Sequence, residues 1–417
     1  MTEREIGGLM PALRSHLRSY GAYLGGSAVG RHISDYCRGL LSDLARKSVE
    51  PIALAAGACV RSLQLLLTKH HWDESGLRDA MQRRIAQEHL PAPGESCDAG
   101  LGVVGWIDET SVAKKGDKTP AVQRQYCGST GKIDNCIVSV HLAVGCGQFS
   151  CIVDSQPYVP QGWLEDARRC KEAGIPRGLA FRTKPEIALE QVKRALGNGL
   201  RLDWIGFDEG YGGKPTFLLG LEQLGVNFIG EVPKNFRCFS VPAKYSSSRP
   251  PCQANEVQHL ARHGKGFKGK GWKKYVVHHK TVPDSTWMVK AARVYISVAG
   301  RCHDTEYWLI VAKNCVTGEI KYFIAHAPPR TALKRMLEAA FSRWGIEHLF
   351  RVAKTEIGLG HYEGRRYRGW IRHMMLCQLV LLFVAEQTER LRGEKSAGDE
   401  GAGGAGSEHA LPAVVAA

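Results

Sequence analysis

Three acidic side chains lie where strands and a helix could bring carboxylates together. Asp108 follows the apolar run LGVVGWI, Asp208 follows the run LDWIGF, and Glu347 lies within RWGIEHLFRVAK. Carboxylates at strand ends and on a covering helix can converge, and their oxygens are the hard ligands that Mg²⁺ or Mn²⁺ prefers. Two such ions, about 3.5–4 Å apart, can hold both the attacking and the leaving oxygen of a phosphodiester. The three residues therefore predict a site for metal-dependent phosphoryl transfer.

Each of these carboxylates also has an ordinary structural explanation. Asp108 could cap a turn, and Asp208 precedes the run EGYGG, which is typical of turns. Glu347 lies four residues after Arg343, a spacing typical of ion pairs on the surface of a helix. Taken one at a time, the residues favour these structural explanations, and only their joint pattern supports a catalytic site.

The segment around Glu347 predicts a helix with one charged face and one apolar face. At about 100° per residue, Arg343, Glu347 and Lys354 fall in one stripe. The apolar residues beside this stripe are Ile346, Leu349, Ala353 and Ile357. The stripe is either a row of surface ion pairs or a catalytic carboxylate flanked by two cations for phosphates. Glu356 falls on roughly the opposite side of the helix, so we interpret it as structural.

The residues before the first acidic strand, 1–95, predict an all-helical domain that binds DNA. Within it, the segment IALAAGACVRSLQLLL has the rhythm of a helix, a glycine turn and a second helix. This rhythm is typical of a DNA-reading helix-turn-helix, which would place Arg61 and Gln64 on the second helix. A plain helical hairpin gives the same pattern, so the sequence leaves both interpretations open.

From residue 100 onward, the pattern predicts an α/β fold with a mixed sheet flanked by helices. Residues 100–234 read as three strands, a helix, a strand, a helix and a strand. Residues 235–328 read as a β-rich insertion that contains no convincing helix. The catalytic core resumes over 329–392 with a long helix from about residue 330, which carries Glu347, and it ends in a strongly apolar helix. Residues 393–417 have the composition of a disordered tail.

The composition of the chain limits the kinds of molecule that it is expected to bind. The 417 residues carry a formal net charge of +15, and Lys and Arg are spread through most of the chain. This distribution favours a polyanion such as nucleic acid over a membrane patch. The sequence has no apolar run of 18 residues and no signal-peptide core at its start, so we expect neither a membrane span nor secretion. The thirteen cysteines form no zinc-binding frame.

Five longer motifs follow one another along the chain: WIDETSVAKKG, RQYCGSTGKIDNCIVSVHLA, FRTKPEIALE, FDEGYGG and IEHLFRVAKTEIGLGHYEGRRYRGWIRH. Through them, the sequence resembles the DDE transposases of bacterial insertion sequences over roughly residues 10–390. The resemblance is nearest to the branch with a β-rich insertion, the insertion-sequence-four group and its seven-hundred-and-one relatives. The signature of that branch is Tyr, two residues, Arg, three residues, Glu, six residues and Lys. Arg343, Glu347 and Lys354 match it, whereas Ala340 replaces the Tyr and Gly360 stands where relatives often carry Asp.

The resemblance implies an RNase H-like core in which Asp108, Asp208 and Glu347 are catalytic and bind two Mg²⁺ ions, for which Mn²⁺ can substitute. It implies a DNA transposase that binds the terminal inverted repeats of an insertion sequence, cleaves the ends and joins them to target DNA. The implied partners are double-stranded DNA and at least a second copy of the chain in the synaptic complex, without a membrane. The implied location is the bacterial cytoplasm, at the nucleoid. Two rivals are a catalytically silent, host-adopted DNA-binding protein and an RNase H-like nuclease that does not join strands.

Positively charged side chains near these motifs are expected to bind the DNA backbone. They are Arg343, Lys354, Lys114, Lys115, Arg182, Lys184, Lys265, Lys268, Lys270, Lys273, Lys274, Arg365 and Arg366. Two insertion tryptophans, Trp272 and Trp287, either stack on a flipped base, as an insertion Trp does in hairpin-forming relatives, or belong to the core of the insertion. We favour the core for both.

Overall fold

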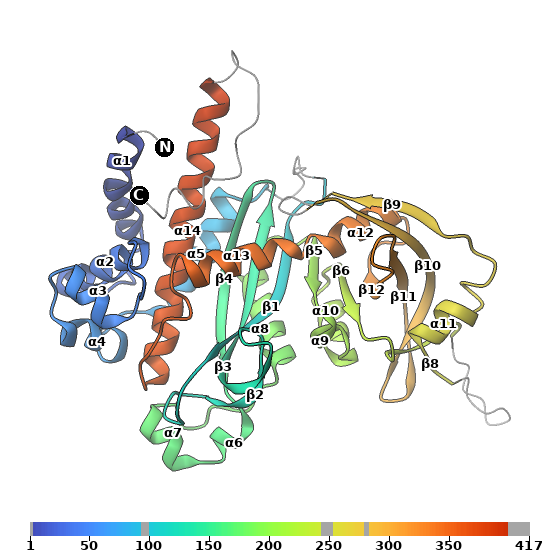
Figure 1. The fold of residues 1–417 in the computed structure, drawn as a ribbon, viewed down its shortest axis with the longest axis horizontal. Coiled ribbons are helices and arrows are strands. Elements are labelled where there is room, and N and C mark those ends of the chain that lie inside the picture. Colours follow the sequence, from blue (N-terminus) through green and yellow to red (C-terminus); the bar gives the residue numbers. More distant parts are fainter. Residues whose placement is uncertain (1–2, 93–99, 243–252, 279–282, 399–417) are drawn as a thin grey trace. The chain divides into compact units, whose positions relative to one another are not determined.

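The computed structural model describes residues 3–92, 100–242, 253–278 and 283–398 (Figure 1). The chain divides into two compact units, and each is described by itself. The first unit contains residues 1–93, 109–200 and 347–417, and the second contains residues 94–108 and 201–346. Strand β1 (Val104–Ala113) supplies its start to the second unit and its end to the first.

The helices of the first unit gather around one long helix. The five N-terminal helices are α1 (Glu3–Ser19), α2 (Ser27–Leu41), α3 (Val49–Ala55), α4 (Val60–Thr68) and α5 (Glu74–Glu88). Helix α14 (Tyr367–Gly398), drawn in red-orange in Figure 1, packs against α2, α4 and α5. The amphipathic repeat of the N-terminal segments thus buries their apolar faces against α14.

A buried arginine fixes α14 to the N-terminal helices. The side chain of Arg372 is fully buried, and its NH1 and NH2 groups donate to the backbone oxygens of Leu66 and Trp72. NH2 also pairs with Glu74 at 3.3 Å, where helix α5 begins. A buried guanidinium is stable only when its donors are satisfied, so these contacts fix the connection between α4 and α5 on α14.

The strands of the first unit are antiparallel. The long strand β3 (Lys132–Cys146) pairs with β2 (Gln123–Cys127) along its first part and with β4 (Phe149–Tyr158) along the rest. The short helices α6 (Gln161–Leu164) and α7 (Ala167–Ala173) follow. Helix α8 (Lys184–Gly197) packs on β3 and β4 and begins with a capping box between Thr183 and Glu186, followed by Pro at the first turn. The helix predicted from KPEIALEQVKRALG is confirmed.

The second unit contains the parallel part of the sheet. Strands β5 (Trp204–Phe207) and β6 (Phe228–Val232) run parallel to β1, and the helices α9 (Glu209–Gly212) and α10 (Pro215–Gln223) connect them. Strand β5 is buried along its whole length, as expected for a central parallel strand. Taken through β1, the strand order is β4, β3, β1, β5, β6, which is the order of an RNase H-like sheet. The predicted mixed α/β fold class is confirmed.

The strands of the insertion extend the β-sheet of the second unit. Strand β12 (Ile320–His326) pairs antiparallel with β6, and β11 (Arg301–Asn314) and β10 (Ser285–Val298) follow in the sheet. Strand β10 also pairs with β7 (Arg237–Phe239) and β9 (Lys273–Val277), and β7 pairs with β8 (Asn255–Glu256). The insertion is therefore β-rich, as predicted. Helix α12 (Leu333–Phe341) follows it and packs on β5 and β6.

Three predictions about helices were wrong. The insertion contains a helix, α11 (Val257–His263), whose short apolar face was too brief to show a period. The long helix predicted from residue 330 is two helices, because the chain turns at residues 342–343 between α12 and α13 (Trp344–Thr355). Helix α14 extends to Gly398, into the segment predicted to be a disordered tail. The rest of that tail, 399–417, lies outside the described residues.

Helix α14 also bears on the question of a membrane. Among the described residues, Tyr367–Arg392 is the one helix whose length and composition would suffice to cross a membrane. Within its most apolar stretch, 89% of the residues are buried inside the protein. Burial of this extent is that of a core helix, and it agrees with the packing of α14 described above.

Candidate active site

Asp108 and Asp208 occupy equivalent positions on neighbouring parallel strands. Strands β1 and β5 pair with Trp106 opposite Gly206, and each aspartate follows two residues later. The backbone of Asp208 is still extended, so it continues the direction of β5. Side chains alternate along a strand, and parallel neighbours lie about 4.8 Å apart. Both carboxylates therefore emerge side by side on the sheet face that carries Trp106.

Asp208 is also the N-cap of helix α9. Its Oδ1 atom accepts a hydrogen bond from the backbone N–H of Gly210 at 3.0 Å and from that of Tyr211 at 3.4 Å. Aspartate is among the preferred N-cap residues because its carboxylate satisfies N–H groups that have no partner within the helix. The turn predicted from EGYGG thus fixes the carboxylate at the end of β5 while using one of its two oxygens.

Arg343 lies beside the first of these aspartates. Its NH1 group donates to the Oδ2 atom of Asp108 at 3.0 Å, and the two side chains are 21% and 15% exposed. The turn between α12 and α13 brings the guanidinium there, so Arg343 precedes the helix that carries Glu347 instead of lying on its surface. In the protein alone, a cation thus partly balances the charge of Asp108.

Trp106 positions this turn on the sheet. Its indole N–H donates to the hydroxyl of Ser342 at 3.1 Å, and the side chain is 7% exposed. A Cβ atom at Gly206 or Gly345 would lie 3.4 Å from the indole ring, an ordinary van der Waals distance, so both glycines pack directly beside the ring. The indole therefore holds the residues around Arg343 against the strands that carry both aspartates. This role of Trp106 was not predicted from the sequence, although its place two residues before Asp108 puts both side chains on one face.

Glu347 lies in the first turn of α13, within the first unit. Its side chain is exposed, and the predicted apolar face of the segment is confirmed, since Ile346, Leu349, Ala353 and Ile357 are each at most 3% exposed. A carboxylate is favoured in the first turn because the helix dipole is positive there. Glu356 follows the end of α13 and receives a hydrogen bond from the Thr355 hydroxyl at 3.0 Å. The approach of Glu347 to the two aspartates stays a prediction.

Helix α13 packs on β3 through aromatic rings. The centroid of the Phe350 ring is 5.0 Å from that of His141, and the Lys354 ammonium lies 5.5 Å from the Phe350 centroid. His141 is fully buried between the hydroxyls of Ser139 and Ser155, at 2.8 and 2.7 Å. Burial, aided by the Lys354 charge, lowers the pKa of His141 to about 3. His141 is therefore neutral at physiological pH and acts as part of the packing beneath α13.

The geometry of the aspartates agrees with the comparisons to known proteins. A family model described as DDE superfamily endonuclease matches residues 22–281, which is more than half of the chain. The chain belongs to this family. The matched range includes both aspartates and ends before Glu347. The predicted kinship with DDE enzymes is therefore confirmed.

One named relative is described as an insertion-sequence protein. The chain is 32% identical over 211 residues to a protein of Microchaete diplosiphon described as the probable transposase for insertion sequence element IS701. The match covers 50% of each chain, so the chain spans about half the length of that relative. A cryo-EM structure of the piggyBac transposase synaptic complex with hairpin DNA covers 94% of this chain and 72% of its own. The two sequences are 10% identical, and the TM-score between the two structures is 0.43.

Several of the cations predicted to bind DNA already bind protein groups. The Lys114 ammonium donates to the backbone oxygen of Tyr362 at 2.5 Å, and burial lowers the pKa of Lys114. Lys184 pairs with Glu109 at 2.7 Å, Arg182 pairs with Glu190, and Arg366 donates to the backbone oxygen of Glu172 at 2.8 Å. Lys115 and Arg365 are exposed.

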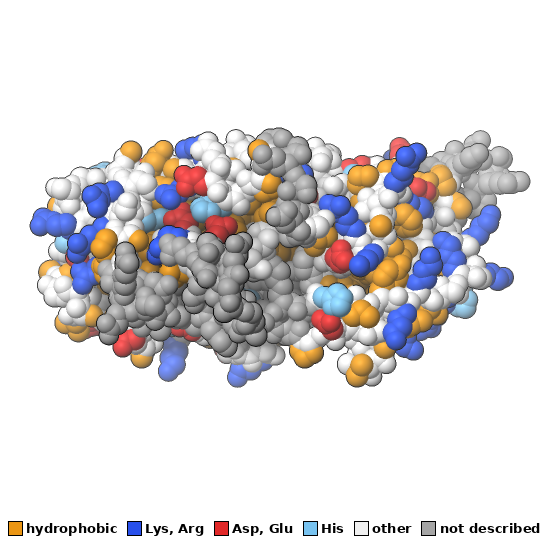
Figure 2. Space-filling view, turned by 90° about the horizontal axis from the view of Figure 1, so that it is seen from above, with side chains coloured by type: hydrophobic (Ala, Val, Ile, Leu, Met, Phe, Trp, Pro, Cys, Tyr) orange, Lys and Arg blue, Asp and Glu red, His pale blue; other side chains and the backbone are white. Residues whose placement is uncertain are grey.

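The lysines of the insertion are placed differently. All five that the sequence singled out are exposed: Lys265, Lys268, Lys270, Lys273 and Lys274. Figure 2 shows Lys and Arg side chains distributed over the part of the surface that the insertion strands form, at the right. Lys273 and Lys274 lie on β9 and the other three precede it; among them, Lys270 donates to the backbone oxygen of Ala291 at 3.1 Å. A group of exposed ammonium groups of this kind attracts a phosphate backbone.

The two insertion tryptophans have different environments. Trp287 is 4% exposed, and its ring centroid lies 4.9 Å from that of Phe341, so it belongs to the core as predicted. Trp272 is 40% exposed, and the Lys290 ammonium lies 4.9 Å from its ring centroid. The core interpretation was therefore wrong for Trp272, because a position beside the glycines of HGKGFKGKGW leaves the ring uncovered.

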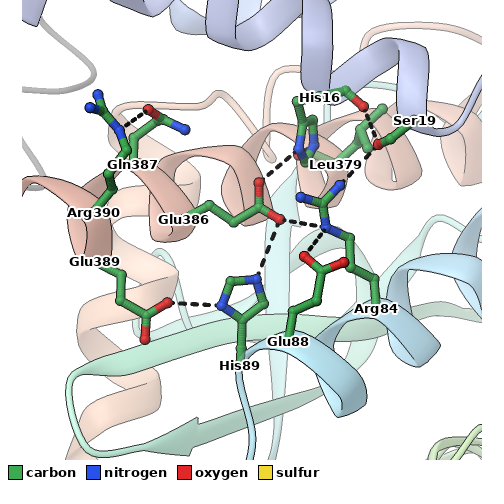
Figure 3. A network of polar contacts seen from close by, with 10 residues as sticks. All are labelled: His16, Ser19, Arg84, Glu88, His89, Leu379, Glu386, Gln387, Glu389 and Arg390. Atoms are coloured by element: carbon green, nitrogen blue, oxygen red, sulfur yellow. Dashed lines mark hydrogen bonds and ion pairs between the residues drawn. The ribbon is translucent and has the colours of Figure 1, made fainter.

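A second group of acidic and histidine side chains lies in the first unit, shown in Figure 3. Glu88, His89 and Glu386 are the described residues whose ligand atoms lie close enough together to hold a metal ion. Arg84, however, pairs with both glutamates at 3.0 Å, so a cation already occupies the centre of this group. His89 pairs with Glu389 at 2.8 Å. We interpret the group as an ion-pair network that joins α5 to α14.

Proposed function

We propose that this chain is a DNA transposase that cleaves the ends of an insertion sequence and joins them to target DNA. The observation that carries the proposal is the pair of aspartates, which emerge together from neighbouring parallel strands beside Arg343. In the first step, water attacks the phosphorus at the element end, and the bond to the 3′ oxygen breaks to leave a 3′-OH. In the second, that 3′-OH attacks a target phosphodiester and displaces the target's 3′ oxygen. No covalent enzyme intermediate is needed.

The residues fit divalent metal ions. Asp108 and Asp208 offer carboxylate oxygens from adjacent strands, and we propose that Glu347 on α13 would supply a third carboxylate. Two bound Mg²⁺ ions, or Mn²⁺ in their place, would activate the attacking oxygen and neutralise charge on the phosphate. The DDE endonuclease model that matches the chain supports a divalent ion as cofactor.

The cations around the carboxylates would bind DNA. Arg343 holds positive charge beside Asp108, where a guanidinium can bind a phosphate through two parallel hydrogen bonds. Lys354 lies two turns after Glu347 on α13 and would bind a neighbouring phosphate. The exposed lysines of the insertion would hold the backbone farther along, with Trp272 among them to stack on an unpaired base.

The sequence of the element end would be read by the N-terminal helices. Helices α2, α3 and α4 pack on one another, and the turn between α3 and α4 contains Gly57 with a φ of +63°. A helix-turn-helix has this arrangement, with its second helix in the major groove. Arg61 and Gln64 are exposed on α4 and would contact base edges. We propose the DNA-reading motif for this segment, although a plain helical hairpin has the same helix packing.

The test is cleavage of duplexes that carry the element's terminal inverted repeats. We expect nicking or cleavage with Mg²⁺ or Mn²⁺ and none with Ca²⁺ or EDTA, since Ca²⁺ accepts looser geometry and positions the attacking oxygen poorly. Cleavage that persists in EDTA would contradict the proposal. Cleavage without joining to a target duplex would favour a nuclease, and binding without cleavage would favour a silent DNA-binding protein.

The assembly and location follow from the proposed reaction. Two element ends must be paired before they are joined to a target, so at least two copies of the chain would act together. The substrates are double-stranded DNA at the element ends and at the target, and the protein would work at the bacterial nucleoid in the cytoplasm. Sedimentation of the protein with end duplexes should show a single complex with the mass of two chains and two duplexes, whereas a complex of one chain and one duplex would contradict the pairing.

A further inference from the structure

The hairpin of β2 and β3 exposes an apolar pair that the active site does not use. Tyr126 and Ile133 lie opposite each other in the antiparallel register, and each is 63% exposed. At this exposure, the two side chains gain little from burial beyond their contact with each other. The other face of the hairpin is buried, since Cys127 and Cys136 pack with Val138. The hairpin is therefore a ribbon with one anchored face and one open face.

The base of this ribbon is fixed to the end of β1. The side-chain amide of Asn135 donates to the backbone oxygens of Lys114 and Gly116, at 2.9 and 2.7 Å. The backbone N–H of Lys114 donates to the backbone oxygen of Asn135 at 2.8 Å. Lys114 follows Asp108 by six residues, so the ribbon is an extension of the strand that carries the first catalytic aspartate.

Positive charge surrounds the apolar pair. Arg124 lies two residues before Tyr126 on the same open face. Lys132 is exposed at the tip, but it pairs with Cys127 in the register and so belongs to the opposite face of the ribbon. Lys115 and Lys118, in the loop that leads into the ribbon, are exposed as well, and Lys118 pairs with Glu172 at 3.9 Å. The nearby carboxylates are the exposed Asp117 and the half-buried Asp134, so the four cations outnumber them. A partner must therefore combine negative charge with apolar surface.

We propose that the β2–β3 ribbon binds a groove of duplex DNA, with Tyr126 and Ile133 against sugars and base edges and with Arg124 and Lys132 on phosphates. A two-stranded ribbon fits the major groove, and apolar side chains commonly wedge into the minor groove of bent DNA. The groove places apolar sugar and base surface between two rows of phosphates, so Tyr126 and Ile133 would meet the apolar surface, while Arg124 on the same face and Lys132 at the tip would reach phosphates. The inference rests on the proposed function in so far as both require duplex DNA.

The test measures binding to a duplex of random sequence, which contains no element end. The first variant, Arg124→Gln with Lys132→Gln, should reduce the log–log salt slope of the binding constant by roughly 0.9 for each phosphate that is no longer neutralised. The second, Tyr126→Ser with Ile133→Ser, should weaken binding roughly tenfold and leave the slope unchanged. The matched controls, Lys334→Gln on α12 and Val316→Ser in the β11–β12 turn, replace an exposed cation and an exposed aliphatic side chain elsewhere. They should bind like the wild type.

Circular dichroism and thermal unfolding should show that all variants fold, because each replaced side chain is exposed. Wild-type affinity and salt slope in both ribbon variants would overturn the inference. So would an apolar variant that binds DNA normally but loses self-association in sedimentation, since the face would then bind a second copy of the chain. Wild-type protein that binds random duplex through the ribbon yet does not cleave element ends would refute the proposed function and leave the ribbon inference standing.

Discussion

The guanidinium of Arg343 lies 3.0 Å from the Oδ2 atom of Asp108. The two residues are 235 positions apart in the chain and meet because the turn between α12 and α13 packs on Trp106. A partly buried carboxylate beside a second one is costly unless a positive charge is near. Arg343 supplies that charge in the protein alone, and metal ions would supply it in the active complex.

Arg343→Ala should lower the rate of end cleavage by roughly ten- to a hundredfold, because one or two charge-assisted hydrogen bonds to phosphate disappear. The Mg²⁺ concentration for half-maximal cleavage should not rise, because Arg343 competes for Asp108 and is not a ligand. Arg351→Ala, an exposed change on α13, is the control and should keep full activity. A several-fold higher Mg²⁺ requirement in Arg343→Ala would contradict this role.

Two substitutions of Asp208 separate its roles as cap and as ligand. Asp208→Asn keeps an oxygen that can accept from Gly210 and Tyr211, so the free energy of unfolding should stay near that of the wild type. Asp208→Ala should lower that free energy by about 1 kcal/mol. Both should reduce cleavage by roughly 10³-fold or more while retaining DNA binding, since several kcal/mol of charge stabilisation is removed. The neighbouring change Glu209→Gln should have no effect, and an active Asp208→Asn enzyme would remove Asp208 from the metal site.

Two glutamates near the start and end of α13 can be compared directly. Glu347→Gln keeps the shape of the side chain but removes the charge that binds metal, so it should abolish cleavage and leave end binding intact. Glu356→Gln should keep substantial activity, because Glu356 follows the helix and bonds locally to Thr355. The cleavage activity of Lys354→Ala should lie between those of the two glutamate variants, because the protein would bind the cleaved end more weakly. An active Glu347→Gln protein together with an inactive Glu356→Gln protein would mean that the third ligand has been misassigned.

The insertion lysines should control the salt dependence of DNA binding. Changing Lys265, Lys268, Lys273 and Lys274 together to Gln should weaken binding and reduce the log–log salt slope by roughly 0.9 for each phosphate that these lysines neutralise in the wild type. Metal-dependent cleavage at saturating protein should be nearly unchanged, since the lysines are not ligands. Titrations between about 50 and 200 mM salt would measure the slope. An unaltered slope would mean that this surface does not lie on DNA.

The network around Glu386 should make stability depend on pH (Figure 3). Burial opposes both charges, but hydrogen bonds to Glu386 and Glu389 raise the pKa of His89 to about 9, and hydrogen bonds from His16 and His89 lower the pKa of Glu386 to about 2. The His89 contribution is full below its unfolded pKa of about 6.5 and is lost as the pH rises through about 9. The Glu386 contribution is full above about 4.5 and is lost as the pH falls toward about 2. His89→Gln should therefore lower Tm most near about pH 6 and least above about pH 9.5. A deficit that is the same at both pH values would show that the charge of His89 is not involved.

Local patterns in the sequence were sufficient for much of this protein. The apolar runs before Asp108 and Asp208 predicted the two strands, because a fully buried parallel strand needs apolar side chains on both of its faces. The 3.6-residue period around Leu349 and Ala353 predicted the buried face of α13, since burial of an amphipathic face follows from side-chain spacing alone. Motifs distributed along the chain also pointed to the DDE family, which the family match confirms.

Tertiary structure decided where charges of distant segments meet. The sequence placed Arg343 in a helical stripe, yet the chain turns at 342–343, where Ser342 accepts the indole N–H of Trp106 and Gly345 packs beside the ring. Lys114 and Lys184 looked like free cations, and only the fold shows that a carbonyl and a carboxylate bind them. Helix periodicity depends on neighbours a few residues away, whereas the partner of a charge or an indole depends on which distant segment packs against it. The sequence indicated the strands that carry the two aspartates and a cation near the proposed site, but the contact between Arg343 and Asp108 and the position of Trp106 depended on the fold.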